Sequence, residues 1–383
     1  MSEDIREKIQ IHNCHVHTFS YRCVPEKFLP GGIIRFVAKR STFFARLLNN
    51  LIPERDDDLY DRYADLIRIM RCSQKDIFDY LRQFYPFDTR FIVLPMDMAY
   101  MEAGKVPKPF TKQLDELLQL KELYPEQMLP FIAVDPRREE ITSIVKEYVE
   151  KGCCGLKLYP PLGYFPYDDR LDAIYEFAQE RQLPIVSHCG VNNPVHTHMK
   201  RRKLIDKIKA ELDPSLGITP TFKGKKNRQL TDYLSHPANY KVVFRKFPNL
   251  KISLAHFGGQ NEWKEFLNPT TFELGASEKE KKKAQKTRED NWFTIIYDML
   301  KEYPNLYSDI SYSLSYQKYF PVLKVILQNP EVRQQILFGT DYHVVRLVIS
   351  ERAFSINLRG YLGEEDFRQI AETNPREFIG NVC

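Results

Sequence analysis

Residues 11–18 read Ile11-His12-Asn13-Cys14-His15-Val16-His17-Thr18 and follow the alternating segment Ile9-Gln10-Ile11. The alternation predicts a β-strand, in which His15 and His17, two positions apart, project from the same face. Two imidazoles on one face supply half of a metal site, although a single His-x-His also arises by chance in ordinary strands. The residues further along the chain decide between these two interpretations.

The composition is that of an ordinary globular protein. Hydrophobic residues make up 43% of the 383 residues and charged residues 28%. No apolar run approaches the roughly 20 residues that cross a bilayer, and the first residues lack the apolar core of a signal peptide. The seven cysteines are odd in number and include no CxxC pair, which favours free thiols. We therefore expect a cytoplasmic protein that does not contact a membrane.

The net charge of +5 is modest and is concentrated in three basic runs, at residues 200–209, 223–228 and 279–288. Such runs are usually solvated faces of helices or loops. Nucleic-acid binding needs a continuous basic stripe with interleaved aromatic residues. We expect no nucleic-acid partner.

Short β-rich segments recur along the chain, each followed by a turn signal and a stretch with helical periodicity. The eight predicted strands are residues 9–19, 90–96, 129–135, 155–159, 184–188, 251–256, 306–311 and 335–341. Eight alternations of strand and helix predict an α/β fold of the (β/α)8 TIM-barrel type rather than a doubly wound sheet. We expect residues 1–383 to form one barrel domain.

Helices are predicted where apolar residues fall at i, i+3, i+4 and i+7, around residues 141–148, 171–178 and 293–300. Three connections are too long for simple loops, at about residues 20–87, 190–230 and 258–290. They follow strands 1, 5 and 6 and so would lie on the carboxyl-terminal face of a barrel. We expect them to be lid and substrate-selecting elements, the first with a helix at residues 58–71.

Polar side chains stand at the carboxyl ends of five predicted strands. They are His15 and His17 on strand 1, Lys157 on strand 4, His188 on strand 5, His256 on strand 6 and Asp341 on strand 8. Packing alone would favour Val or Leu at such positions. Their convergence on one barrel mouth therefore indicates a functional site.

At these residues the chain resembles the amidohydrolase superfamily, specifically its amidohydrolase-related branch. That branch includes hydrolases and metal-dependent decarboxylases similar to the aminocarboxymuconate semialdehyde enzyme. The resemblance covers most of the chain and rests on ordered motifs: Asn-Cys-His-Val-His from residue 13, Gly-Leu-Lys-Leu-Tyr-Pro-Pro from 155, Val-Ser-His-Cys-Gly from 186, Leu-Ala-His-Phe-Gly-Gly from 254, Phe-Gly-Thr-Asp-Tyr from 338 and Asn-Pro-Arg-Glu-Phe-Ile-Gly from 374. One departure is Asn13, because the family often has Asp two residues before its first metal-binding histidine.

The resemblance implies that His15, His17 and Asp341 bind a divalent metal ion, with His188 as a further ligand. It makes His256 either a ligand or a proton-transfer residue. Imidazoles with one carboxylate suit zinc best, with manganese or iron as alternatives, and leave a position for a water molecule whose pKa the metal lowers. Asp341 would accept the proton of that water as general base.

Lys157 determines the expected number of metal ions. Some superfamily members carboxylate a lysine on strand 4, and the resulting carbamate bridges two ions, with His188 and His256 holding the second. Otherwise Lys157 stays an ammonium group that neutralises substrate charge or pairs with a carboxylate. The resemblance leaves one and two ions open.

Other polar residues have simpler alternatives. Asp309 on strand 7 could orient a metal-bound histidine or make a hydrogen bond at the barrel end. Arg137 and His343 are candidate contacts to an anionic substrate, although a loop salt bridge is the simpler role for Arg137. His196 and His198 are expected at the surface or in a substrate loop.

The expected function is metal-dependent hydrolysis of an amide, ester or lactone carbonyl in a small, anionic substrate. The alternative is a lyase that decarboxylates a small carboxylated substrate at the same metal. Lys157 favours hydrolysis, because the similar decarboxylases lack it. A metal-free barrel that binds partners through its basic insertions would leave the mouth residues without a role. A homodimer is the default expectation for assembly.

Overall fold

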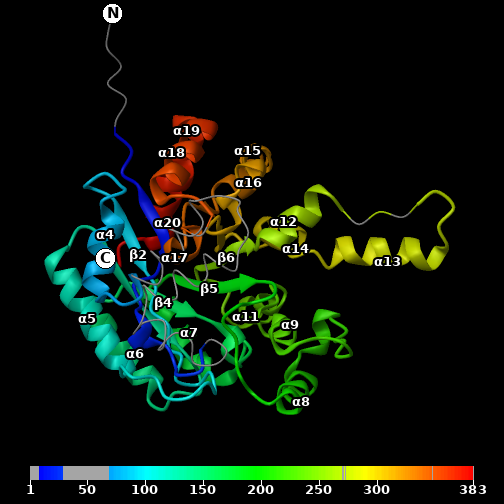
Figure 1. The fold of residues 1–383 in the computed structure, drawn as a ribbon, viewed down its shortest axis with the longest axis horizontal. Helices are drawn as coiled ribbons and strands as arrows, with labels where there is room; N and C mark the ends of the chain where they lie inside the picture. Colours follow the sequence, from blue (N-terminus) through cyan, green and yellow to red (C-terminus); the bar gives the residue numbers. More distant parts are fainter. Residues whose placement is uncertain (1–7, 29–68, 270, 272, 347, 383) are drawn as a thin grey trace, which may run out of the picture.

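The computed structural model describes residues 8–28, 69–269, 271, 273–346 and 348–382. Eight parallel strands alternate with helices in this part of the chain (Figure 1). The strands are β1 (His12–Val16), β2 (Arg90–Val93), β3 (Met128–Val134), β4 (Gly155–Leu158), β5 (Ile185–Gly190), β6 (Ile252–Gly258), β7 (Leu306–Asp309) and β8 (Ile336–Leu337). The predicted TIM barrel is confirmed, and the ends of its strands differ from the prediction by a few residues.

Each strand pairs with the next one in the sequence, in the order β1 to β8. The ring of strands nearly closes where the last strand meets the first. Cys14 N–H donates to Phe338 O at 2.8 Å, and Asp341 N–H donates to His15 O at 2.8 Å. A ring of parallel strands places all their carboxyl ends on one face, so residues distant in sequence become neighbours there.

Helices surround the strands (Figure 1). They are α4 (Gln74–Arg82), α5 (Phe110–Leu123), α6 (Ile141–Glu150), α7 (Asp172–Glu180), α8 (Arg201–Glu211), α9 (Asn227–Leu230), α10 (Asp232–Ser235), α11 (Asn239–Lys246), α12 (Gln260–Leu267), α13 (Glu278–Glu289), α14 (Trp292–Glu302), α15 (Phe320–Ile326), α16 (Pro330–Arg333), α17 (Tyr342–Val345), α18 (Glu351–Leu362), α19 (Glu364–Arg368) and α20 (Asn374–Ile379). The three helices predicted from periodicity are confirmed as α6, α7 and α14. The helix predicted at residues 58–71 lies almost wholly outside the described residues.

The core lies between the strands and these helices. Val145 on α6, Ile174 on α7 and Ile296 on α14 belong to one apolar cluster with the strand residues and are at most 1% exposed. Each helix therefore contributes the apolar stripe that its sequence predicts, and removal of this surface from water holds it against the barrel.

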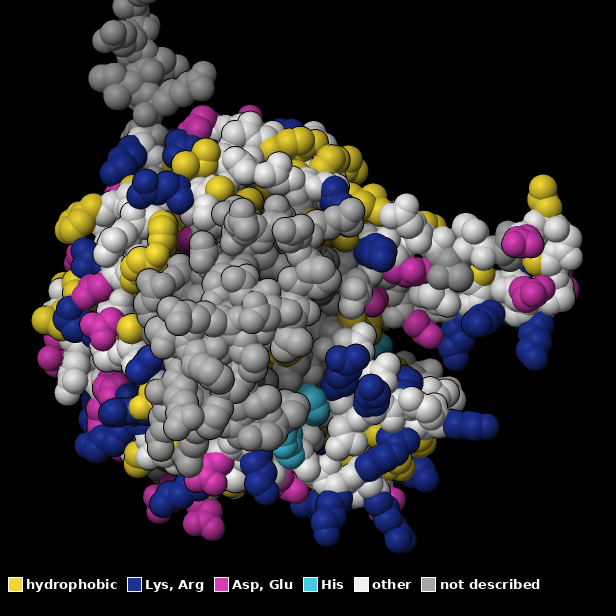
Figure 2. All heavy atoms as spheres, viewed as in Figure 1, with side chains coloured by type: hydrophobic (Ala, Val, Ile, Leu, Met, Phe, Trp, Pro, Cys, Tyr) yellow, Lys and Arg dark blue, Asp and Glu magenta, His cyan; other side chains and the backbone are white. Residues whose placement is uncertain are grey.

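The described parts of two long connections carry helices of their own. Helices α8, α9 and α10 follow β5, and α12 and α13 follow β6, with α13 projecting away from the barrel (Figure 1). Most Lys and Arg side chains on α8 and α13 are exposed, and Figure 2 shows them facing outwards. These basic runs are solvated faces, as predicted. None of the helices in the described ranges is long and apolar enough to cross a membrane.

The expectation of free thiols holds for most of the described cysteines. Cys14, Cys23, Cys153 and Cys189 have free thiols. Cys154 is disulfide-bonded, and there the expectation is wrong.

Candidate metal centre

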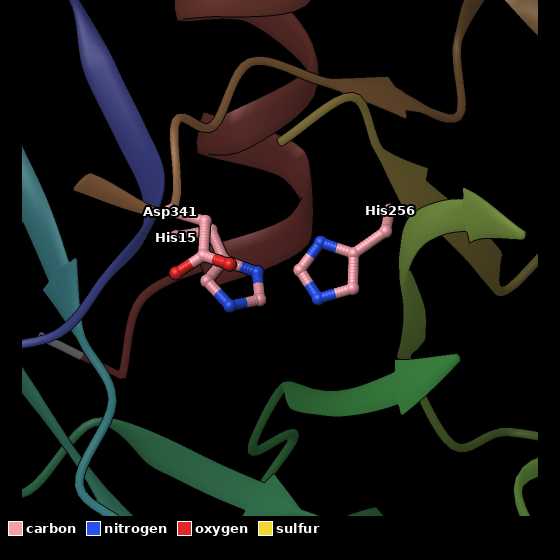
Figure 3. A group of neighbouring side chains, drawn as sticks. All are labelled: His15, His256 and Asp341. Atoms are coloured by element: carbon pink, nitrogen blue, oxygen red, sulfur yellow. The ribbon is translucent and has the colours of Figure 1, made fainter. Parts of the chain in front are cut away.

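Side chains from β1, β6 and the segment that follows β8 meet at the mouth of the barrel. His15, His256 and Asp341 are buried, and each places one donor atom within 4.8 Å of the others. Figure 3 shows His15 and Asp341 side by side, with His256 facing them from β6. His17 Nε2 lies 3.8 Å from Asp341 Oδ1, and His188 Nδ1 lies 3.2 Å from His256 Nε2. The structure thus brings together five of the predicted metal-binding residues.

The two histidines of the N-terminal motif are each held at Nδ1. His15 Nδ1 lies 3.0 Å from Asp309 Oδ2, and His17 Nδ1 lies 2.6 Å from Leu94 O. A carboxylate and a carbonyl oxygen only accept hydrogen bonds, so both Nδ1 atoms carry the proton and both Nε2 atoms keep a free lone pair. His15 Nε2 is buried and has no hydrogen-bond partner among the described residues.

His256 and His188 are held in the same manner. Ser311 Oγ donates to Asp309 Oδ1, and it therefore accepts from His256 Nδ1 at 2.9 Å. His188 Nε2 donates to Asn193 Oδ1. The lone pairs of His256 Nε2 and His188 Nδ1 consequently face each other with no proton between them.

This donor set fits a divalent metal ion. Two nitrogens bound to one tetrahedral ion at about 2.0–2.1 Å would be about 3.3 Å apart, close to the observed 3.2 Å between His188 and His256. A lone-pair contact of this kind, beside an unpartnered His15 Nε2 and a buried carboxylate, is unfavourable without a cation. Metal-bound histidines are usually held at their other nitrogen in this way.

The backbone is strained where it presents two of these side chains. His256 and Phe257 at the end of β6 have φ of 70° and 44°, and Asp341 has φ of 54°. Residues with a Cβ rarely adopt these values, and such strain persists where the surrounding structure fixes it, often at functional sites. Gly258 follows with φ of 83°, and a Cβ there would lie 3.0 Å from Trp292 Cβ.

The electrostatics favour neutral imidazoles. Burial lowers the pKa of His15, His17, His188 and His256, and the positive charge of Lys157 contributes to each shift. The histidines are therefore unprotonated near neutral pH, which is the state that binds a metal ion. Burial also raises the pKa of Asp341.

Lys157 belongs to the same group of side chains. Lys157 is 1% exposed, and its buried amino group has no hydrogen-bond partner among the described residues. Burial lowers its pKa, while the charges of Asp309 and Asp341 oppose that shift. A buried amine without a partner is costly, so it requires an explanation in terms of function.

A cavity of about 230 Å³ opens at this centre. His17, His188, His256 and Asp341 form part of its wall, and the rings of Phe19, Tyr159 and Tyr312 form another part. Tyr159 stacks on His188 with the ring centres 4.3 Å apart. The remaining wall includes the amide side chains Asn192, Asn193, Gln260 and Asn261. This volume suits a small molecule.

Of the three candidate substrate-binding residues, His343 lines the cavity, whereas Arg137 and Lys157 do not. His343 lines the cavity, and its ring stacks on Phe19 at 5.2 Å. Arg137 does not line it: its guanidinium pairs with Asp135 at 2.6 Å and donates to Leu162 O at 3.0 Å. His15 and Lys157 are buried without lining the cavity.

The wall, as far as it is described, contains no Lys or Arg. The prediction of an anionic substrate therefore gains no support from this wall. His196 and His198 also lie outside it, with their rings 5.9 Å apart.

The sequence did not indicate some of the residues that hold the histidines. Asn193 and Ser311 are polar residues just beyond strand ends, but no local pattern shows that their side chains turn back to His188 and His256. Asn13, the departure from the family motif, donates to Thr340 Oγ1 at 2.9 Å and accepts from Thr340 N–H at 3.2 Å. It thus ties β1 to the residue before Asp341.

Several solved structures share this fold. One is a 2,6-dihydroxybenzoate decarboxylase from Rhizobium (14% identity, 97% of this chain and 99% of that chain covered, TM-score 0.52). Another is a 5-carboxyvanillate decarboxylase from Novosphingobium aromaticivorans with manganese bound (13%, 98% and 97%, TM-score 0.52). A third is a probable 2-pyrone-4,6-dicarboxylic acid hydrolase from Acinetobacter baumannii (10%, 97% and 100%, TM-score 0.52). At these identities the likeness is one of fold.

No curated protein matches this chain significantly. A family model described as "Amidohydrolase" matches residues 82–380, which is most of the chain. The match spans strands β2 to β8 and includes Lys157, His188, His256 and Asp341. The chain therefore belongs to the amidohydrolase family and is an enzyme of the amidohydrolase superfamily.

Proposed function

We propose that this enzyme is a metal-dependent hydrolase that cleaves an amide, ester or lactone bond in a small substrate. The observation that carries the proposal is the buried, unpartnered amino group of Lys157, within electrostatic reach of four inward-facing histidines and Asp341. A divalent metal ion, zinc being the expected one, would polarise the scissile carbonyl and lower the pKa of a water molecule there.

His15, His17, His188, His256 and Asp341 would hold the metal. Lys157 could join them as a carbamate, since an uncharged amine adds to carbon dioxide to form a carbamate anion and releases one proton. The oxygens of such an anion could bind the metal, and the buried nitrogen would no longer carry a positive charge. The lowered pKa of Lys157 raises the fraction of the uncharged amine that this reaction needs.

Asp341 would take the proton from the attacking water. Its carboxylate lies in the wall of the cavity, and its backbone N–H is fixed to His15 O at 2.8 Å. Tyr159, Tyr312 and the amide side chains would orient the rest of the substrate and reduce its contact with water. His256 is the alternative proton carrier, because it faces the same cavity.

The variant Asp341→Asn tests the base. An asparagine oxygen can still bind the metal but cannot accept the proton, so turnover should fall by roughly 100-fold or more while metal content stays close to that of the wild type. Turnover and metal content per protein would be measured together. The matched control is Asp135→Asn, which alters another strand-end carboxylate that pairs with Arg137 outside the cavity. Wild-type turnover in Asp341→Asn would rule out Asp341 as the base.

A second candidate is decarboxylation of a small aromatic acid. It is favoured by the aromatic part of the cavity wall and by the two decarboxylases of aromatic acids that share the fold. In this reaction Asp341 or His256 would supply the proton that replaces the lost carboxylate. A panel of carboxylated aromatic acids, lactones and amides, with carbon dioxide release measured beside hydrolysis, distinguishes the two reactions.

The variant Lys157→Met also distinguishes the hydrolase from the decarboxylase. If the enzyme is the proposed hydrolase, turnover should fall by roughly 100-fold or more, and Lys157→Arg should not restore it, because the guanidinium stays protonated and forms no carbamate. Far-ultraviolet circular dichroism would show that both variants are folded. Retained turnover in Lys157→Met would favour the decarboxylase.

A further inference from the structure

His188 can bind a metal ion only in one of its two neutral forms. Its Nδ1 faces His256 Nε2 at 3.2 Å inside the site, and its Nε2 contacts Asn193 Oδ1. Since a carbonyl oxygen accepts hydrogen bonds, this contact keeps the ring proton on Nε2 and leaves the Nδ1 lone pair free. The orientation of one amide group thus decides whether His188 is a competent ligand.

The orientation of Asn193 is set on its far side. Asn193 is 1% exposed, and its Nδ2 donates to Asp232 Oδ1 at 3.3 Å and to Ser235 Oγ at 3.4 Å. Rotating the amide by 180° would place Oδ1 against the Asp232 carboxylate, where both oxygens are acceptors and repel each other. It would also place Nδ2 against His188 Nε2, which would drive the ring proton to Nδ1. Of the two acceptors, only the ionised carboxylate cannot donate, because a serine hydroxyl can rotate and do so.

Asp232 is itself an unusual carboxylate. It is the first residue of α10, it is only partly exposed, and among the described residues it forms no ion pair within 4 Å. Its hydrogen bonds come from Asn193 Nδ2 and from the backbone N–H of Asn192 at 2.9 Å. Lys225 and Arg228 are near enough for their charges to favour its ionised form, but burial outweighs them and raises its pKa, and both of its hydrogen-bond donors belong to the segment that follows His188.

We propose that Asp232 is a positioning residue that acts through Asn193 to keep the proton of His188 on Nε2, so that Nδ1 remains available to a metal ion. The inference rests on the proposed metal centre. Asp309 does the same for His15 by direct contact at 3.0 Å. The two carboxylates thereby fix two imidazoles of the centre, one directly and one through an amide.

The test uses metal-free, full-length protein with ¹⁵N-labelled histidine rings. Spectra would be recorded near pH 8.5, because burial raises the pKa of Asp232 to about 7 and the carboxyl is then ionised. The His188 signals are identified by their loss in His188→Gln. The wild type should show a protonated Nε2 and an unprotonated Nδ1. Asp232→Asn keeps the size of the side chain but can donate as well as accept, so the two forms of His188 should become mixed.

The second readout is the affinity for zinc, measured by competition with a chelator. Asp232→Asn should bind zinc roughly 10- to 100-fold more weakly, as is typical when a group that holds a metal ligand is lost. The matched control is Ser235→Ala, which removes the neutral acceptor of the same amide and should leave both readouts unchanged. Asn193→Ala removes the amide itself and should reproduce the effects of Asp232→Asn, which keeps the test available if one variant does not fold.

The outcomes separate this inference from the proposed metal centre. A single Nε2-protonated form of His188 in both Asp232→Asn and Asn193→Ala, or a wild type protonated at Nδ1, would overturn the inference. Mixed forms in Asp232→Asn, together with wild-type zinc affinity in His188→Gln, would support Asp232 as the positioning residue while removing His188 from the metal centre.

Discussion

At the scale of single residues, the site is defined by which nitrogen of each histidine points inwards. His15, His17, His188 and His256 are each held at one ring nitrogen by an oxygen atom, and the other nitrogen faces the centre or its cavity. The holding atoms come from a carboxylate, a backbone carbonyl, an amide and a hydroxyl. This arrangement turns neutral imidazoles into oriented ligands before any ion arrives.

Asp309 is the residue on which most of this orientation depends. It accepts from His15 Nδ1, and it also accepts from Ser311, which in turn holds His256. In Asp309→Asn the new amide can donate to His15 Nδ1 and favour the form protonated at Nε2. We expect zinc affinity to fall roughly 10- to 100-fold, measured by chelator competition.

The control for Asp309→Asn is Ser308→Ala on the same strand. Ser308 is buried and donates to Leu254 O at 2.5 Å, away from the histidines. The Ser308→Ala variant should bind zinc with the affinity of the wild type. Equal affinities for Asp309→Asn and the wild type would show that Asp309 does not orient His15.

At the scale of elements, the strand ends hold the site because the backbones there pack closely. Gly339 lies between β8 and Asp341, and a Cβ on it would lie 2.9 Å from His15 Cβ and 3.3 Å from His15 N. The close approach lets β1 and the segment after β8 present His15 and Asp341 side by side (Figure 3). A helix glycine elsewhere has no such constraint: Gly360 on α18 has open space around its missing Cβ.

These two glycines give a matched prediction. Gly339→Ala should destabilise the protein by about 1–3 kcal/mol through overpacking against His15, and should also weaken zinc binding. Gly360→Ala should stabilise the protein by about 0.5–1 kcal/mol, because alanine loses less backbone entropy in a helix. Denaturant unfolding of both metal-free variants measures the change. A Gly339→Ala protein as stable as the wild type would contradict the packing argument.

At the scale of the whole molecule, closure of the strand ring is what assembles the site. The hydrogen bonds from Cys14 N–H to Phe338 O and from Asp341 N–H to His15 O join segments more than 300 residues apart. Global unfolding therefore exposes both the ligands and the buried histidines around them. Stability should for this reason depend on pH through histidines that are buried in the neutral form.

His12 gives the clearest case. It is 1% exposed, and burial, assisted by the charge of Arg90, lowers its pKa to about 4 from 6.5. Between these values the unfolded chain binds a proton at His12 and the folded chain does not. The free energy of unfolding is therefore highest above pH 6.5 with respect to this group, and it decreases as the pH falls towards 4. The full shift corresponds to about 3 kcal/mol.

The corresponding measurement is the free energy of unfolding of metal-free protein at pH 7 and pH 5. His12→Gln should lose less stability over this range than the wild type. His198→Gln alters an exposed histidine whose pKa burial also lowers, and it should change the pH dependence less than His12→Gln does. Identical pH dependence in His12→Gln and the wild type would show that His12 does not titrate in this way.

The sequence by itself determined the barrel and the positions from which the candidate ligands project. Alternation with period 2 and apolar stripes with period 3.6 are local properties, so eight strands and helices α6, α7 and α14 could be predicted from short segments. The rule that parallel strands present their carboxyl ends on one face then placed His15, His188, His256 and Asp341 together.

Only the tertiary structure decided how those side chains are oriented and which polar residues hold them. Asp309 meets His15, and Asp232 meets Asn193, across gaps of tens to hundreds of residues in the chain. Arg137 is paired with Asp135 instead of lining the cavity. The physical reason is that a hydrogen bond depends on distance and angle between atoms brought together by the fold, whereas sequence periodicity records only which face of an element a residue occupies.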